Sequence, residues 1–123
     1  MQKYRNRPTN MNGKRFDSGR EAKRFAELQL LERAGKISDL RRQVPFELIP
    51  AQYEEYTTYT PKKRLPKVAK RCVERSVVYR ADFVYRLPDG REVVEDAKGC
   101  RTDEYIIKRK LMLYVHGIRV SEV

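Results

Sequence analysis

The sequence predicts a single α/β domain with a small mixed sheet, in the order helix, strand, strand, strand, helix, strand. Three observations predict this class. The chain has 123 residues, 40% of them hydrophobic, which suits one domain over 1–123. Two segments carry helix-start and helix-stop residues. Between them, two alternating segments flank a Pro-Asp-Gly turn. Because the last strand follows a helical crossover, it could lie parallel to its neighbour.

Both predicted helices are bounded by residues that favour helix ends. Ser18 begins the first helix and Gly35 ends it. The apolar residues of this helix surround so much of its circumference that we expect it to be buried or covered by a partner. Thr102 is a suitable N-cap for the second helix, which is predicted to run to His116 and to stop at Gly117.

Alternating apolar residues predict the strands. Pro45 places segment 43–49 near a sheet edge or makes it the start of a strand, because proline cannot donate to a ladder. Segment 76–87 is expected to turn its odd-numbered apolar residues to one face, and 91–98 to return beside it. A short final strand is predicted at 118–123.

The hairpin turn sets the strand register. A three-residue loop with Gly90 in the left-handed conformation pairs residues whose numbers sum to 178. Asp82 then faces Asp96, with Cβ atoms about 5 Å apart. These like charges repel unless a cation lies between them. Hard oxygen ligands favour Mg²⁺, or Mn²⁺ as a substitute, over zinc. We therefore expect a divalent metal here, with Lys98 pointing the same way.

Several other classes of protein are disfavoured. Cys72 and Cys100 stand far apart without a CxxC pair, so neither a zinc site nor a disulfide scaffold is expected. The single histidine excludes a two-histidine metal site. No apolar run approaches the roughly 18 residues of a membrane span, and 1–15 is polar and basic. We expect a cytoplasmic protein without a membrane partner.

The formal net charge of +11 is concentrated in one part of the chain. Residues 1–75 hold 19 basic and 9 acidic side chains, against 9 and 8 in 76–123. Residues 1–16 are predicted to form a basic N-terminal arm. Residues 51–75 are predicted to form a basic loop, used as a binding arm because it is unusually long. Nucleic acid is the expected partner, and solubilising surface is the alternative.

The loop over 51–75 combines aromatic with basic residues. Its tyrosines Tyr53, Tyr56 and Tyr59 either stack on unpaired bases, insert at a branch point or pack the loop against the sheet. The basic residues expected to contact nucleic acid are Lys62, Lys63, Arg64, Lys67, Lys70 and Arg71.

Three segments resemble a known superfamily. Tyr79-Arg80-Ala81-Asp82-Phe83 with Val94-Glu95-Asp96-Ala97-Lys98-Gly99 resembles the PD-(D/E)XK nucleases, and Phe16-Asp17-Ser18-Gly19-Arg20-Glu21-Ala22 resembles their small phage and prophage Holliday junction resolvase-like family. The likeness covers most of the chain but not Ala51–Arg75, and Ala81 replaces the usual proline. It implies a restriction-endonuclease-like α-β-β-β-α-β core and Mg²⁺-dependent endonuclease cleavage of DNA, expected to be branched.

The resemblance and the hairpin register together assign site residues. The expected catalytic residues are Glu21, Asp82, Asp96 and Lys98, and the expected metal ligands are Asp82, Asp96, the Ala97 carbonyl and Glu21. Lys98 would orient or help deprotonate the attacking water. Glu21 is either a catalytic carboxylate, as the resemblance implies, or half of a capping box with Ser18.

Further residues are expected near the phosphates. Arg80 shares a face with Asp82 and is either a phosphate clamp or a charge partner of that aspartate. Lys108 and Lys110 on the second helix either approach the DNA or form a solvated face. Glu95 points to the opposite face and is expected to be structural, unless a bulge exchanges it with its neighbour.

Two other functions remain open. A non-catalytic nucleic-acid-binding protein would explain the charge but not the facing aspartates. A nuclease of another specificity, such as a restriction-like, nicking or single-strand-cleaving enzyme, would use the same site. Symmetric cleavage of a four-way junction needs two active sites, so that substrate predicts a homodimer.

Overall fold

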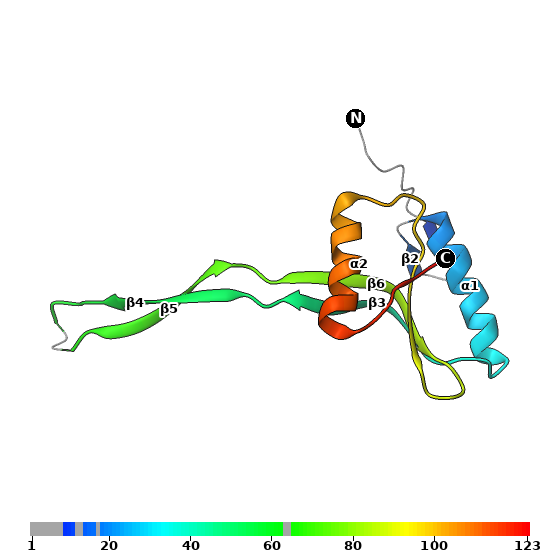
Figure 1. Ribbon diagram of the computed structural model, residues 1–123, viewed down its shortest axis with the longest axis horizontal. Helices are drawn as coiled ribbons and strands as arrows, with labels where there is room; N and C mark the ends of the chain where they lie inside the picture. Colours follow the sequence, from blue (N-terminus) through cyan, green and yellow to red (C-terminus); the bar gives the residue numbers. More distant parts are fainter. Residues whose placement is uncertain (1–8, 12–13, 17, 63–64) are drawn as a thin grey trace.

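The computed structural model describes residues 9–11, 14–16, 18–62 and 65–123. Its central sheet contains, in spatial order, β3 (Ser38–Ile49), β6 (Val77–Arg86), β7 (Glu92–Asp96) and β8 (Ser121–Glu122). The first three strands are antiparallel, and β8 lies parallel to β7. Helices α1 (Gly19–Arg33) and α2 (Asp103–His116) cover opposite faces of this sheet (Figure 1). The predicted α/β class with a mixed sheet is confirmed.

The prediction of a loop over 51–75 is wrong. The segment contains β4 (Gln52–Thr58) and β5 (Lys67–Glu74), which pair antiparallel. This two-stranded ribbon follows on from β3 and β6 and projects far from the body of the domain (Figure 1). The strands have no buried side chain, so neither face carries the alternating apolar pattern by which a strand is recognised. Residues 63–64 lie outside the described residues.

The N-terminal segment is also more ordered than a basic arm. Strands β1 (Thr9–Met11) and β2 (Lys14–Phe16) form a second short hairpin. Phe16 at its end is only 1% exposed and packs on Phe25 of α1. The arm predicted over 1–16 is therefore wrong for this part, because an aromatic anchor ties it to the core. Residues 1–8 lie outside the described part of the chain.

Two apolar clusters hold the helices to the sheet. The cluster below α1 contains Phe83 and Tyr85, and the cluster below α2 contains Tyr79, Ala81 and Val84. The prediction that all odd-numbered apolar residues of 76–87 share one face is therefore wrong. The sheet is covered on both sides, so both faces of β6 are apolar and hydrophobicity alone does not separate them.

Helix α1 buries only one of its faces. Its N-cap is Ser18, as predicted, and Gly35 follows its end with a φ of +74°. The buried apolar residues Ala22, Phe25 and Leu28 face the sheet. Leu30 is 63% exposed, so the helix is not buried on all sides within the described residues, and cover by a partner stays a prediction.

The predicted hairpin register is confirmed. Leu87 N–H donates to the Arg91 carbonyl at 2.9 Å, and Gly90 adopts a φ of +90°. Phe83 pairs with Glu95, so the pairing numbers sum to 178 as expected. Strand β7 ends at Asp96, and the final strand covers only 121–122 of the predicted 118–123. The order of α2 and parallel β8 follows the prediction.

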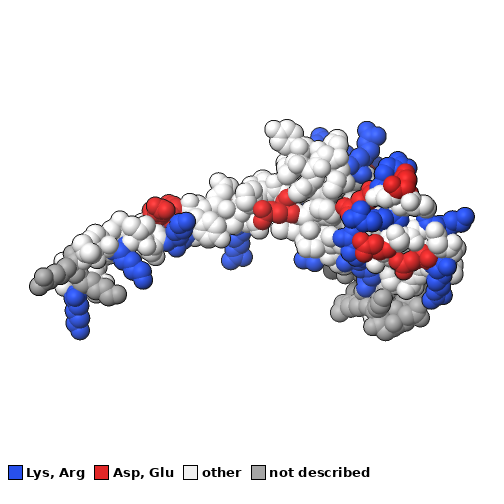
Figure 2. Space-filling model, turned by 90° about the horizontal axis from the view of Figure 1, so that it is seen from below, with Lys and Arg blue, Asp and Glu red and all other residues white. Residues whose placement is uncertain are grey.

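The surface charge is unevenly distributed. On the face seen in Figure 2, acidic and basic side chains gather over the body, whereas most of the ribbon surface is uncharged. Neither helix of the described chain has the length and apolar character needed to cross a membrane.

Candidate functional site

Two carboxylates lie together beside the end of β7, and a third is joined to them through an amide side chain. Asp82 lies on β6, Asp96 ends β7, and Glu21 lies in the first turn of α1. Gln43 of β3 connects two of them, because its Nε2 donates to Glu21 Oε1 at 2.8 Å and to Asp82 Oδ1 at 3.2 Å. Sequence reasoning missed Gln43. The only sign of it was a polar residue directly before the apolar strand that starts at Val44.

Asp96 is a buried carboxylate close to a second one. It is 1% exposed, and burial and then the negative charge of Asp82 raise its pKa from 3.8 to about 7. The hydroxyl of Tyr79 donates to Asp96 Oδ2 at 2.5 Å, and Lys98 Nζ lies 3.5 Å from Oδ1. Both contacts favour the charged form, but they do not offset burial and repulsion. The two carboxylates, Asp82 and Asp96, therefore attract a further positive charge.

Asp82 lies beside Asp96, one position beyond the last paired residues, Phe83 and Glu95, as the predicted register requires. The backbone N–H of Ala97 donates to Asp82 Oδ2 at 2.9 Å, which holds the side chain against the end of β7. Asp82 is half-buried and receives this bond together with that of Gln43. Both oxygens of Asp82 and one oxygen of Asp96 thus accept from neutral donors, and the two carboxylates remain close together.

The backbone of Gln43 is strained at this point. Its φ is +51°, in the left-handed region that costs a non-glycine residue about 1 kcal/mol or more. The flanking residues Arg42 and Val44 pair with Phe83 and Ala81, so Gln43 lies opposite Asp82. The irregular backbone turns the amide toward the carboxylates. Strain of this kind persists where the surrounding structure holds it in place.

The donor set fits a hard divalent cation. Asp96 Oδ1 is buried and has no hydrogen-bond partner, although it lies beside Asp82 and below Lys98. In the described ranges no three His, Cys, Asp or Glu side chains are gathered as a ready-made metal site. A cation would thus be held by the two aspartates and by backbone or water oxygens, a mixed set that suits Mg²⁺. The Gln43 amide stands between Glu21 and Asp82.

Glu21 combines a cap position with a buried side chain. Its backbone N–H donates to Ser18 Oγ at 3.2 Å, so Ser18 caps the helix as predicted. The side chain is 3% exposed, accepts from Gln43 and lies 3.8 Å from Arg42 Nη2. A carboxylate needed only for capping would not be buried against a strand on another element. The structure places Glu21 in the cluster.

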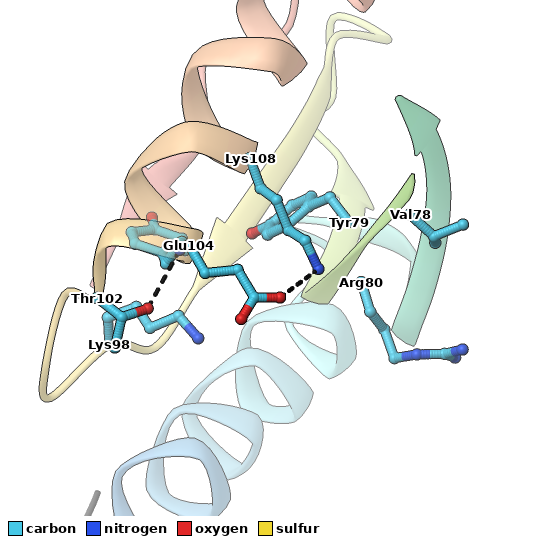
Figure 3. Close-up of a pocket in the computed structure, with 8 residues that line it drawn as sticks. Val78, Tyr79, Arg80, Lys98, Thr102, Glu104 and Lys108 are labelled. Atoms are coloured by element: carbon cyan, nitrogen blue, oxygen red, sulfur yellow. Dashed lines mark hydrogen bonds and ion pairs between the residues drawn. The ribbon is translucent and has the colours of Figure 1, made fainter. Parts of the chain in front are cut away.

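A pocket of about 490 Å³ is lined by Tyr79 and Lys98, which both contact Asp96, and it collects basic side chains. Arg80 from β6, Lys98 after β7 and Lys108 from α2 line it (Figure 3). Lys108 Nζ lies 3.1 Å from Glu104 Oε1, and Arg80 Nη1 donates to the Gln43 carbonyl at 3.3 Å. These three predicted phosphate contacts are brought together at one opening.

Tyrosines form the base of this pocket. Tyr79 and Tyr105 line it, and Lys98 Nζ lies 4.9 Å from the Tyr105 ring centre. The hydroxyl of Tyr105 is buried without a hydrogen-bond partner. Burial, followed by the charge of Asp96, raises the pKa of Tyr105, so it stays a neutral donor. Sequence reasoning assigned neither tyrosine to the site.

The remaining predicted contact residues lie elsewhere. Lys110 lines a different hollow with Arg109 and Arg119, away from the carboxylates. Lys62, Lys67, Lys70 and Arg71 belong to the β4–β5 ribbon, remote from the pocket (Figure 1). Lys63 and Arg64 lie outside the described residues. The site and the ribbon are therefore two separate features.

Glu95 has a structural role on the opposite face of β7, as expected. It is 2% exposed and accepts two hydrogen bonds from Arg24, at 2.9 and 2.8 Å, and one from Tyr85. Arg24 lies one turn after Glu21 on α1. This ion pair fastens the strand that carries Asp96 to the helix that carries Glu21. No bulge exchanges the two carboxylates.

Comparison with known proteins gives one family. A family described as "Protein of unknown function (DUF1064)" matches residues 1–120. No curated protein and no solved structure matches the chain.

Proposed function

The chain belongs to the DUF1064 family of proteins of unknown function, and we propose from its site that it is a Mg²⁺-dependent DNA endonuclease. The observation that carries this proposal is Asp82 beside a buried Asp96 whose pKa is raised to about 7, with Lys98 at 3.5 Å. Two carboxylates with a lysine that lines a basic pocket suit phosphodiester hydrolysis.

The metal in this proposal is held by Asp82, Asp96 and the Ala97 carbonyl. When bound, Mg²⁺ would lower the pKa of a water and neutralise charge on the phosphoryl oxygens. Glu21 contributes through Gln43 or through a water. Mn²⁺ offers the same hard-ligand chemistry and is the expected substitute.

The protein's own groups then carry out the remaining tasks. Lys98 Nζ lies 3.5 Å from Asp96 Oδ1, so its ammonium group can donate a hydrogen bond that orients the attacking water. Its ammonium group also stabilises the charge that develops on the phosphoryl group. Arg80 and Lys108 hold the phosphate at the pocket opening. The Gln43 amide keeps the carboxylates of Glu21 and Asp82 in place.

DNA is the proposed substrate because the chain is strongly basic. The net charge of +11 favours a polyanion at long range. The β4–β5 ribbon extends the reach of the protein well beyond one phosphate. We assign the core to the restriction-endonuclease-like arrangement, and a branched DNA such as a Holliday junction as the preferred substrate. Symmetric cleavage of a four-way junction then requires a homodimer.

The test is cleavage of matched DNA by purified protein. Linear, nicked, forked and four-way molecules are incubated with Mg²⁺ or with EDTA, using wild type and Asp96→Asn. Glu55→Gln, which alters an exposed carboxylate on the ribbon, is the matched control. The proposal requires Mg²⁺-dependent products from wild type and the control, and loss of at least about 100-fold in Asp96→Asn. DNA binding without cleavage in Mg²⁺ and Mn²⁺ would instead identify a non-catalytic binding protein.

A further inference from the structure

The tip of the β4–β5 ribbon carries two large apolar side chains in water. Tyr59 is 70% exposed and Leu65 is 80% exposed, and Val68 near the end of the paired strands is also exposed. Nothing in the described body covers them, because the ribbon projects away from it (Figure 1). Exposed apolar side chains gathered at the end of a projection indicate a contact surface rather than a packing element.

Charge is distributed along the ribbon in a way that singles out the same tip. The two strands hold three basic residues, Lys67, Lys70 and Arg71, and three acidic residues, Glu54, Glu55 and Glu74. Arg71 is paired with Glu54, and Lys70 lies opposite Glu55. The connecting segment 59–66 holds three basic residues and no acidic one. The shaft is thus close to neutral and the tip is cationic, and much of the shaft surface in Figure 2 is uncharged.

The shaft is also built to hold its shape. Seven residue pairs connect β4 with β5. Arg71 stacks 4.7 Å from the Tyr56 ring centre, and Thr58 Oγ1 donates to the Lys67 carbonyl at 3.1 Å, next to the tip. If the strands bound phosphates along their length, their basic side chains would not be expected to lie beside acidic ones. A rigid neutral shaft instead presents the tip as a separate contact.

We propose that Tyr59 and Leu65 form a wedge that inserts into DNA where base stacking is already interrupted, at a nick or a branch point. The partner is DNA because basic residues lie close to the apolar pair along the chain, with Lys62 between Tyr59 and Leu65 and Lys67 two residues after Leu65, and cations of this kind bind phosphates. Opening an intact base step costs free energy, and an interrupted step costs less. This inference rests on the proposed DNA substrate and deepens it, because it gives the ribbon the task of recognising discontinuous DNA.

The experiment measures binding in EDTA, where no cleavage occurs. Fluorescence anisotropy gives the Kd for an intact duplex, a nicked duplex of the same sequence and a four-way junction. A 2-aminopurine beside the nick reports unstacking by an increase in fluorescence. The wedge variant is Tyr59→Ser with Leu65→Ser. The matched control is Tyr53→Ser, which removes a tyrosine that is 63% exposed on the shaft.

The wild type and the control are expected to bind nicked DNA about fivefold or more tighter than intact DNA, and to brighten the probe. The wedge variant should lose both the preference and the brightening, yet bind intact duplex within about twofold of wild type. Lys62→Ala with Lys67→Ala should weaken all three DNAs and reduce the salt slope by about 2. Unchanged circular dichroism shows that these exposed substitutions leave the fold intact.

Three results would overturn the wedge. They are an undiminished nick preference in the wedge variant, an equal loss in the Tyr53→Ser control, and tighter binding to vesicles of anionic phospholipid than to any DNA. Failure of the proposed nuclease activity is a different result, because it is seen only in the cleavage assay with Mg²⁺. If the protein prefers nicked DNA in EDTA but never cleaves DNA in Mg²⁺, the wedge proposal stands and the endonuclease proposal fails.

Discussion

Replacing Asp96 with asparagine should stabilise the metal-free protein at alkaline pH while it abolishes cleavage. Asp96 is buried beside Asp82, which raises its pKa from 3.8 to about 7. An acid with a raised folded-state pKa binds its proton more tightly in the folded than in the unfolded chain. Stability from this group is therefore complete below about pH 4, falls as the pH rises, and is lost above about pH 7.

The size of the effect follows from the shift. A change from 3.8 to about 7 corresponds to at most about 4 kcal/mol, at about 1.4 kcal/mol per pH unit. Both aspartates contribute to this loss of stability. We therefore expect Asp96→Asn to recover about half of it, about 2 kcal/mol of unfolding free energy, at pH 8. The asparagine carbonyl still accepts from Tyr79. For a chain of 123 residues this raises Tm by roughly 6–10 °C.

Thermal unfolding in EDTA at pH 4 and pH 8 measures the difference in stability between wild type and Asp96→Asn. Wild type should lose more stability between these values than Asp96→Asn does. Mg²⁺ at pH 8 should raise the Tm of wild type but not that of the variant. Glu55→Gln, on the exposed ribbon, should follow wild type throughout. A variant that at pH 8 is no more stable than wild type would refute the reasoning that Asp96 is a repelled, buried carboxylate.

The other predictions concern residues around the same strand. Lys98→Ala should lower the cleavage rate by about 100-fold or more with an unchanged Kd in EDTA, and equal losses in rate and binding would reduce Lys98 to a phosphate contact. Glu21→Gln should leave Tm within about 2 °C, since the cap uses the backbone N–H of this residue and the amide oxygen still accepts from Gln43, and it should lower the rate; full activity would leave Glu21 without a catalytic role. Arg24→Met should cost about 3 kcal/mol by urea unfolding, because it leaves Glu95 buried without its cation, and a cost below about 1 kcal/mol would show that Tyr85 alone satisfies Glu95.

Features defined by local chemistry were predictable from the sequence. The helix caps at Ser18 and Thr102 and the glycine ends depend on neighbouring residues alone. The register that brings Asp82 opposite Asp96 depends only on the length of one turn and the conformation of Gly90. The candidate site could be outlined because two of its carboxylates lie on this single hairpin.

Features defined by contacts between distant segments were not predictable. Gln43 reaches Glu21 and Asp82 only because a strained backbone in β3 turns its amide inward. Tyr79 read as an ordinary apolar strand residue, although its hydroxyl serves Asp96. The ribbon was missed for a different reason. Its strands have no buried face, so they show no alternating hydrophobic pattern in the sequence.

The neighbouring carboxylates Glu95 and Asp96 have a consequence for how the sheet aligns. A shift of β7 by one position would send Asp96 toward α1 and Glu95 toward the pocket. The shorter aspartate would then have to meet the guanidinium fork of Arg24, and the longer glutamate would crowd Tyr79. Because the two acids differ in length, only the observed register of β7 places each of them in a position that fits its partners. Helix α1 supplies Glu21 to the cluster, and through Arg24 it also decides which acid of the strand joins it.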